Sequence, residues 1–111
     1  MQKDTIFALS TPQGVGGVAV IRISGPQAQA ALQALFQPAG TSPMEPRKLI
    51  YGRFVFDGTQ IDDGMAVLFC APASYTGEDS AELHCHGSLA VVQQLLGALG
   101  TLPGLRPAEP G

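Results

Sequence analysis

Hydrophobic positions in the first third of the chain fall into short runs separated by turn-forming residues. Residues Thr5–Leu9 are mostly apolar or β-branched, and Val18–Ile23 form a second run of this kind. The intervening Ser10–Gly17 holds three glycines and a proline, which is typical of a turn. Apolar residues then recur at helical spacing from Ala28 to Phe36, which predicts an amphipathic helix of about three turns.

The second half of the chain shows a longer alternation. Two apolar stretches, Leu49–Phe56 and Ile61–Phe69, flank the sequence Asp57-Gly58-Thr59-Gln60, which predicts two antiparallel strands joined by a four-residue turn. Residues Ala81–His86 alternate again and predict a fifth strand, and a second helix is expected between Leu89 and Leu99. The tail Pro103–Gly111 contains three prolines and two glycines, so we expect a linker there.

The predicted order β-β-α-β-β-β-α favours an α+β domain, with a mixed β-sheet and about two helices packed on one face. The length of 111 residues fits a single small domain. Apolar residues make up 45% of the chain and charged residues 14%, which indicates a folded domain rather than a disordered tail. Two cysteines and the lack of a long apolar run predict a cytoplasmic protein without a membrane segment.

Charge and motif content exclude several functions. The net charge of -3 is the wrong sign for a module that holds nucleic acid by neutralising phosphates. The pattern G-x-x-x-x-G-K-[ST] is absent from the sequence, so this chain lacks the phosphate cradle of GTP hydrolysis. Cys70, Cys85 and Ser74 are candidate nucleophiles, but no base or orienting group accompanies them. We therefore assign no catalytic residue.

The segment Gly14–Ala19 fits the dinucleotide pattern G-x-G-x-x-A. That pattern requires a helix whose N-terminal amides meet a pyrophosphate, whereas Val18–Ile23 is β-branched and predicts a strand. We expect a tight glycine loop instead. Such a loop either closes a hairpin or lets a ligand approach the backbone.

Three polar side chains share one face of the predicted strand Ala81–His86, namely Glu82, His84 and His86. They could bind a divalent metal, although a closed site needs a further ligand. Alternatively, the histidines are hydrogen-bonded residues on a sheet face. In a third interpretation Glu82 accepts N–H bonds from a heterocyclic ligand.

Arg22 lies within the apolar strand Val18–Ile23, where an unpaired guanidinium would be costly. The sequence leaves two partners open. One is a salt bridge to Glu82 or Glu78, and the other is the carboxylate of a ligand.

Several segments together resemble one family. They are DTIFALSTPQGVGGVAVIRISGP, YGRFV, SYTGEDSAELHCHG and RPAEPG. In this order they resemble the N-terminal domain of the tRNA-modification GTPases called MnmE or TrmE, over the chain from Asp4 to Gly111. The combination of VIRISGP with YTGED and the following E-x-x-x-H-G is specific, unlike the lone glycine pattern.

This resemblance implies a fold similar to tetrahydrofolate-binding aminomethyltransferase domains, a homodimer formed through this domain, and binding of 5-formyl-tetrahydrofolate or a related folate. It implies Arg22 and Glu82 as folate-site residues. Weaker candidates for cofactor binding around them are Gly16, Gly17, Tyr75, Thr76, Gly77 and His84. We expect the pterin ring to meet Glu82 and the folate tail to meet Arg22.

The resemblance also implies a longer protein, of which residues 1–111 form the N-terminal domain. Family members continue into helical and GTPase domains, which bind GTP, Mg²⁺ and K⁺. With the flavoprotein MnmG they build a carboxymethylaminomethyl-type group on carbon 5 of the tRNA wobble uridine. The domain alone is expected not to be catalytic. The alternative function is a freestanding metal-binding enzyme that uses Glu82, His84 and His86.

Two positions depart from the family pattern. Val15 stands where members commonly carry arginine, and Ser88-Leu89 replaces a glycine-proline pair. We expect Ser88 to cap the second helix instead. Neither change touches Arg22 or Glu82.

Overall fold

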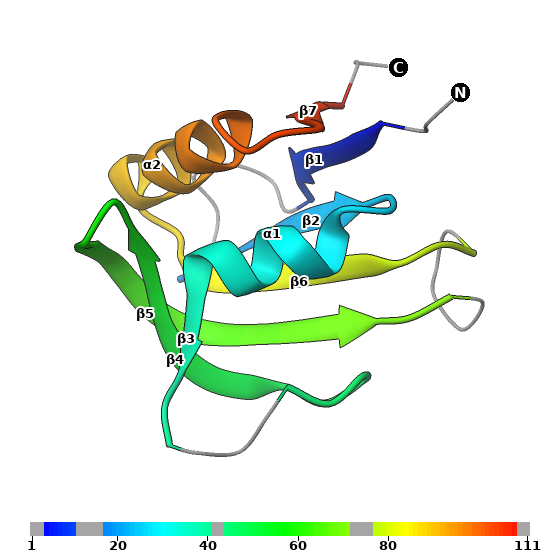
Figure 1. The fold of residues 1–111 in the computed structure, drawn as a ribbon. Coiled ribbons are helices and arrows are strands. Elements are labelled where there is room, and N and C mark those ends of the chain that lie inside the picture. Colours follow the sequence, from blue (N-terminus) through cyan, green and yellow to red (C-terminus); the bar gives the residue numbers. More distant parts are fainter. Residues whose placement is uncertain (1–3, 11–16, 41–43, 72–76, 109–111) are drawn as a thin grey trace.

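The computed structural model describes residues 4–10, 17–40, 44–71 and 77–108. In these ranges the chain forms seven strands and two helices (Figure 1). Their order is β1 (Thr5–Leu9), β2 (Val18–Ser24), α1 (Ala28–Leu35), β3 (Phe36–Pro38), β4 (Ile50–Phe56), β5 (Thr59–Phe69), β6 (Ser80–His86), α2 (Leu89–Gly100) and β7 (Leu105–Pro107).

The described strands form one mixed sheet in the order β3-β4-β5-β6-β2-β1-β7. The β1–β7 pair is parallel and the other pairs are antiparallel. The predicted α+β class is therefore confirmed. The turn between β4 and β5 is shorter than predicted, because Thr59 already pairs with Phe56. It consists of Asp57 and Gly58, which both have positive φ, as a two-residue hairpin turn of this kind requires.

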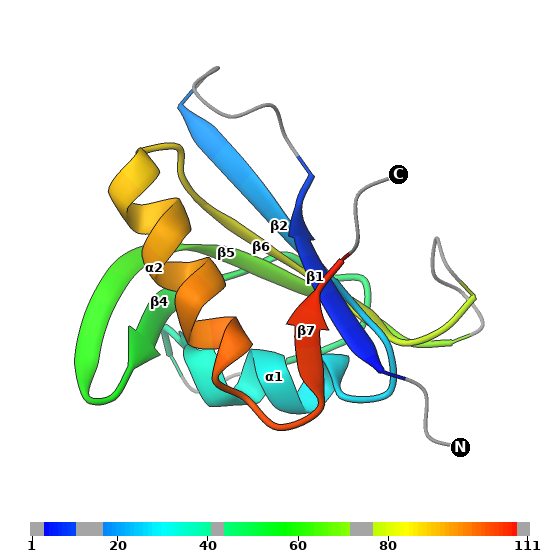
Figure 2. The same cartoon turned by 90° about the horizontal axis from the view of Figure 1, so that it is seen from above.

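Both helices lie on the same side of the sheet (Figures 1 and 2). The buried odd-numbered residues of β2 and β6 share one core with the buried residues of the two helices. The core is made by Phe7, Ala19, Ile21, Ile23, Ala28, Ala31, Leu32, Leu35, Phe36, Phe54, Ala66, Leu68, Ala81, Leu83, Cys85, Val92, Leu95, Ala98 and Leu99. Ser88 caps α2 by accepting from the backbone N–H of Val91, as predicted.

The sequence reasoning missed the two edge strands. β3 and β7 are three residues long and each ends in proline, so neither shows a readable alternation. The prediction of a linker at Pro103–Gly111 was therefore wrong for Leu105–Pro107. This segment pairs with β1, and Arg106 also donates from Nε to Oδ2 of Asp4 at 2.7 Å.

The opposite face of the sheet carries the even-numbered residues of β2 and β6, and neither helix covers it (Figures 1 and 2). We call it the uncovered face. Arg22, Glu82 and His84 lie on it, beside Met65 and Val67 of β5. None of the described helices combines the length and apolar character that a membrane span requires.

Candidate functional site

An ion pair joins the two central strands on the uncovered face. Arg22 of β2 lies directly opposite Glu82 of β6 in the antiparallel ladder. Its Nε and Nη2 donate to Oε2 of Glu82 at 3.3 and 2.9 Å. The Glu82 side chain is only 13% exposed, whereas that of Arg22 is 40% exposed. The carboxylate is therefore fixed while part of the guanidinium remains accessible.

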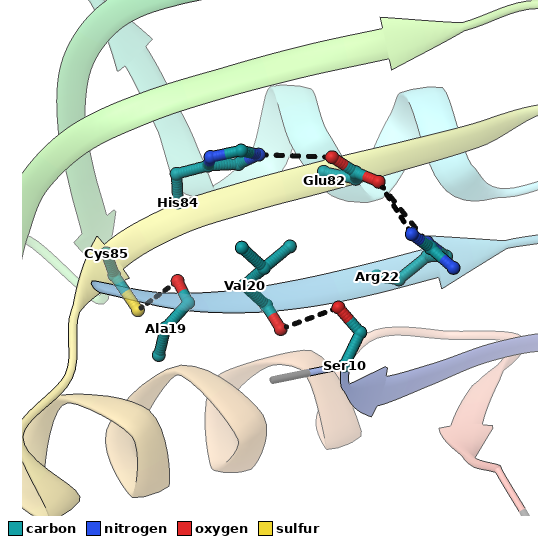
Figure 3. Close-up of polar contacts among 7 residues, drawn as sticks. All are labelled: Ser10, Ala19, Val20, Arg22, Glu82, His84 and Cys85. Atoms are coloured by element: carbon teal, nitrogen blue, oxygen red, sulfur yellow. Dashed lines mark hydrogen bonds and ion pairs between the residues drawn. The ribbon is translucent and has the colours of Figure 1, made fainter. Parts of the chain in front are cut away.

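The second oxygen of Glu82 is also occupied. Oε1 lies 3.1 Å from Nε2 of His84, two residues along the same strand. Figure 3 shows Arg22 and His84 reaching Glu82 from different sides. Burial raises the pKa of Glu82, but the hydrogen bonds from His84 and Arg22 together outweigh it and hold that pKa below its usual range. Glu82 therefore stays ionised at neutral pH.

Of the partners that the sequence left open for Arg22, the salt bridge to Glu82 is present. Glu78 accepts a hydrogen bond from Oγ of Ser24 at 2.9 Å. The sequence-predicted residues Arg22, Glu82 and His84 thus form one polar group, which we call the Arg22–Glu82–His84 group. The Glu82 carboxylate and the accessible part of the Arg22 guanidinium therefore lie side by side.

His86 belongs to a different cluster. Its Nδ1 lies 2.8 and 3.0 Å from the two carboxylate oxygens of Asp62, and its backbone N–H donates to Oδ2 at 2.8 Å. The hydrogen bond and the charge of Asp62 raise the pKa of His86. Asp63 beside it accepts from the hydroxyl of Tyr51.

The grouping of Glu82, His84 and His86 as metal ligands was therefore wrong. In the described part of the chain, the one group of three that could hold a metal is Asp62, Asp63 and His86, with donor atoms within 4.8 Å of one another. The sequence reasoning missed both aspartates. They lie 24 and 23 residues before His86, inside a stretch that predicted only a strand, and no local motif joins them to it.

A pocket lies between β5, β6 and the start of β2, next to both clusters. We call it the β5–β6 pocket. Its volume is about 240 Å³, and its lining residues are Gly17, Val18, Asp63, Gly64, Met65, His84, Cys85 and His86. Glycine is required at position 64, because a Cβ there would lie 2.1 Å from the carbonyl oxygen of His84. The pocket borders the Arg22–Glu82–His84 group through His84.

Among the weaker candidates for cofactor binding, Gly17 and Gly77 lie outside the two polar clusters. Gly17 lines the pocket and accepts from the N–H of Gly87, and Gly77 has a positive φ. Gly16, Tyr75 and Thr76 lie outside the described residues.

Two functional interpretations of the sequence are excluded by the same region. Val18–Ser24 is a strand, so the glycine pattern cannot open a dinucleotide-binding helix. Burial raises the pKa of the Cys85 thiol to about 11, which makes it a poor nucleophile. Cys70 and Cys85 are both free thiols.

Comparison with known proteins agrees with the resemblance. The family described as GTP-binding protein TrmE N-terminus matches residues 5–111. The chain is 52% identical over 110 residues to the tRNA modification GTPase MnmE of Parvibaculum lavamentivorans, a match that covers 97% of this chain and 24% of that protein. For the protein of the same name from Ruegeria pomeroyi the identity is 50%, with the same coverage. For that from Rhodospirillum rubrum it is 46%, over all of this chain and 27% of the relative.

The chain spans about a quarter of the length of the curated relatives it matches. The match nevertheless includes β1 to β7 and every residue of the two clusters. The chain therefore belongs to the TrmE N-terminal family, whose curated relatives are named as tRNA modification GTPases.

Proposed function

We propose that this domain binds a tetrahydrofolate-type one-carbon carrier, such as 5-formyl-tetrahydrofolate, and forms a homodimer. In the longer family protein it supplies the carrier to a GTPase that works with the flavoprotein MnmG on the wobble uridine of tRNA. The GTP, Mg²⁺ and K⁺ sites of that protein belong to its other domains, and its site of action is the cytoplasm. The domain itself acts by binding.

The Arg22–Glu82–His84 group carries this proposal. It presents an ionised carboxylate and a partly exposed guanidinium on the uncovered face. A folate has ring N–H and amino donors, which suit a carboxylate, and tail carboxylates, which suit a guanidinium. The group therefore offers a partner for either end of the ligand, at one place on the uncovered face.

The ion pair refines the expected arrangement of the ligand. Arg22 and Glu82 are in hydrogen-bond contact, so they cannot lie at opposite ends of an elongated carrier. Glu82 uses both oxygens within the protein, although a carboxylate has about four acceptor positions. Ligand donors can therefore reach Glu82 without breaking its contacts with Arg22 and His84.

Calorimetric titration of the purified chain with 5-formyl-tetrahydrofolate tests carrier binding. Charge reversal in Glu82→Lys should abolish binding, because the lysine repels Arg22 and the acceptor is lost. Circular dichroism should show that the variant keeps the fold. Glu45→Lys is the matched control, since Glu45 forms an exposed ion pair with Lys48 outside the group. Unchanged carrier affinity in Glu82→Lys would contradict the assignment of Glu82 to the carrier site.

Dimerisation is supported by the uncovered face, where Val18 and Tyr51 are each more than half exposed. Apolar residues exposed beside polar groups suit burial against a second copy. Sedimentation equilibrium over a range of protein concentrations should give the dimer mass. A monomer at every concentration would contradict this part of the proposal, and the calorimetric result would still stand.

A further inference from the structure

Three metal-type donors converge beside the part of β5 that does not pair with β6. One carboxylate oxygen each from Asp62 and Asp63 and one ring nitrogen of His86 all lie within 4.8 Å of one another. Successive residues of a regular strand point to opposite faces of the sheet, so two adjacent carboxylates rarely meet a third donor in this way. We call these residues the Asp62–Asp63–His86 cluster.

The cluster holds more negative charge than its protein neighbours balance. In the ranges that the structure describes, neither aspartate forms an ion pair with a lysine or an arginine. The Asp62 side chain is only 10% exposed, and a poorly hydrated carboxylate beside a second one is costly without a cation. Even a protonated His86 supplies one positive charge against two negative ones. A divalent cation supplies both.

Contacts around the cluster hold its carboxylates in place. The hydroxyl of Tyr51 donates to Oδ2 of Asp63 at 2.5 Å, and the backbone N–H of His86 donates to Oδ2 of Asp62 at 2.8 Å. Hydrogen bonds of this kind orient the ligands of metal sites in proteins. Each carboxylate has about four acceptor positions, so both keep positions for a metal ion.

The distances are close to those of a bound ion. Zinc–ligand distances of about 2.0–2.2 Å put two tetrahedral ligands about 3.4 Å apart. His86 Nδ1 now lies 2.8 and 3.0 Å from the oxygens of Asp62, and the largest separation in the cluster is under 4.8 Å. The His86 side chain is 66% exposed, so it has room for the shift of about 1 Å that would equalise these distances.

The adjoining pocket has room for the remaining ligands. Asp63 and His86 both line the β5–β6 pocket, whose volume is about 240 Å³, whereas one water takes about 30 Å³ of liquid volume. One imidazole with two carboxylates suits zinc and related transition metals better than Ca²⁺ or Mg²⁺, which prefer oxygen ligands alone. Three protein ligands with one open position are a known zinc arrangement.

We propose that Asp62, Asp63 and His86 bind a divalent transition-metal ion of the zinc class, with water from the β5–β6 pocket completing its coordination. The ion joins β5 to β6 where their ladder is open. The site shares no residue with the Arg22–Glu82–His84 group, so it holds whether or not the domain binds a folate.

Calorimetric titration of the untagged, metal-free chain with zinc chloride tests the site. We expect one ion per chain. Each of His86→Gln and Asp63→Asn should weaken zinc binding at least about tenfold, because each removes a ligand. Asp57→Asn is the matched control, since Asp57 is an exposed aspartate of the β4–β5 turn outside the cluster, and its zinc affinity should equal that of the wild type.

Two further measurements identify the ligands and the effect on the fold. The absorption spectrum of the chain with Co²⁺ in place of zinc should lack the charge-transfer band of a thiolate ligand. The thermal unfolding midpoint should rise with zinc concentration in the wild type and stay constant in His86→Gln. That variant should fold without metal, because the side chain it replaces is mostly exposed.

Three results overturn the proposal. One is a wild-type chain that binds no zinc, and another is equal zinc affinity in His86→Gln and the wild type. The third is a thiolate band with Co²⁺, which would place the ion on Cys70 or Cys85. His84→Gln separates this site from the grouping of Glu82, His84 and His86: zinc binding should survive in it, and its loss there with retention in His86→Gln also overturns the proposal.

Discussion

Replacing Arg22 by methionine tests the ion pair as a source of stability. Met keeps much of the length of the side chain and removes the two donors to Oε2 of Glu82. A hydrogen bond to a charged group is worth about 1.5–3 kcal/mol when it is buried. The guanidinium is 40% exposed and His84 still holds the other oxygen, so solvent screening and the remaining contact reduce the loss. We expect Arg22→Met to lower the free energy of unfolding by about 1–2 kcal/mol at pH 7.

The pH dependence gives this prediction its sign. The pKa of Glu82 in the folded chain lies below 4.5, the usual value of a glutamate carboxyl. The stability that comes from the ionised carboxylate is therefore fully present above pH 4.5 and is lost as the pH falls through the folded-state pKa. The difference between wild type and Arg22→Met should shrink as the pH is lowered through that range.

Urea unfolding followed by circular dichroism, at pH 7 and at successively lower pH, measures the loss of stability in Arg22→Met and its dependence on pH. Arg53→Met is the control, because the Nη2 of Arg53 donates to the neutral amide of Gln37 on the exposed surface. It should change stability by less than about 0.5 kcal/mol at every pH. A loss in Arg22→Met that is the same at pH 7 and under acid conditions would refute the reasoning, as would no loss at pH 7.

Two further predictions concern the pocket region and the glycines. Asp62→Asn should lower the pKa of His86 toward its usual value, and NMR titration of the ring measures this change. In the wild type the stabilising effect of the pair is present below pH 6.5 and is lost as the pH rises through the raised pKa of His86. An unchanged pKa of His86 in the variant would contradict the contact with Asp62. Gly64→Ala should lower the free energy of unfolding by about 3 kcal/mol or more, since the added Cβ would meet backbone. Gly97→Ala adds a Cβ in open space at an exposed helix position and should raise the free energy of unfolding by about 0.5–1 kcal/mol. Thermal unfolding compares the two variants, and a change of the same sign in both would contradict the packing argument.

The elements with a clear period could be predicted from the sequence. Strands such as Thr5–Leu9 and the helix Leu89–Gly100 repeat apolar residues at periods of two and 3.6, and this repetition reflects burial on one face. β3 and β7 could not be predicted, because a three-residue strand contains no full alternation. Such strands form because a neighbour offers an unpaired edge, which only the assembled sheet contains.

The polar residues of the site also include some whose placement could be predicted from the sequence and some whose placement could not. The strand period alone puts Glu82 and His84 on one face, and the cost of burying a charge demands a partner for Arg22. That His86 bonds to Asp62 instead of joining Glu82 depends on β5 pairing with β6 only from Met65 onward, so that Asp62 lies in a part of β5 that does not pair with β6. This separation is a property of two strands together, and neither sequence encodes it locally.

The Arg22–Glu82 pair also bears on the register of β2 against β6. The hydrophobic pattern selects which residues face the helices, so it forbids a slip of one residue but tolerates a slip of two. A two-residue slip would place Arg22 opposite His84 or Ser80 and would leave the poorly exposed carboxylate of Glu82 opposite Ser24 or Val20. Both outcomes separate the two charges on a face where Glu82 is largely buried, and that is costly. The ion pair therefore favours the observed register over the alternatives that the apolar pattern allows. This role in the register needs no ligand, so the stability of Arg22→Met and its affinity for the carrier are separate quantities. A loss of affinity supports the binding proposal only when the variant is shown to be folded at the temperature of the titration.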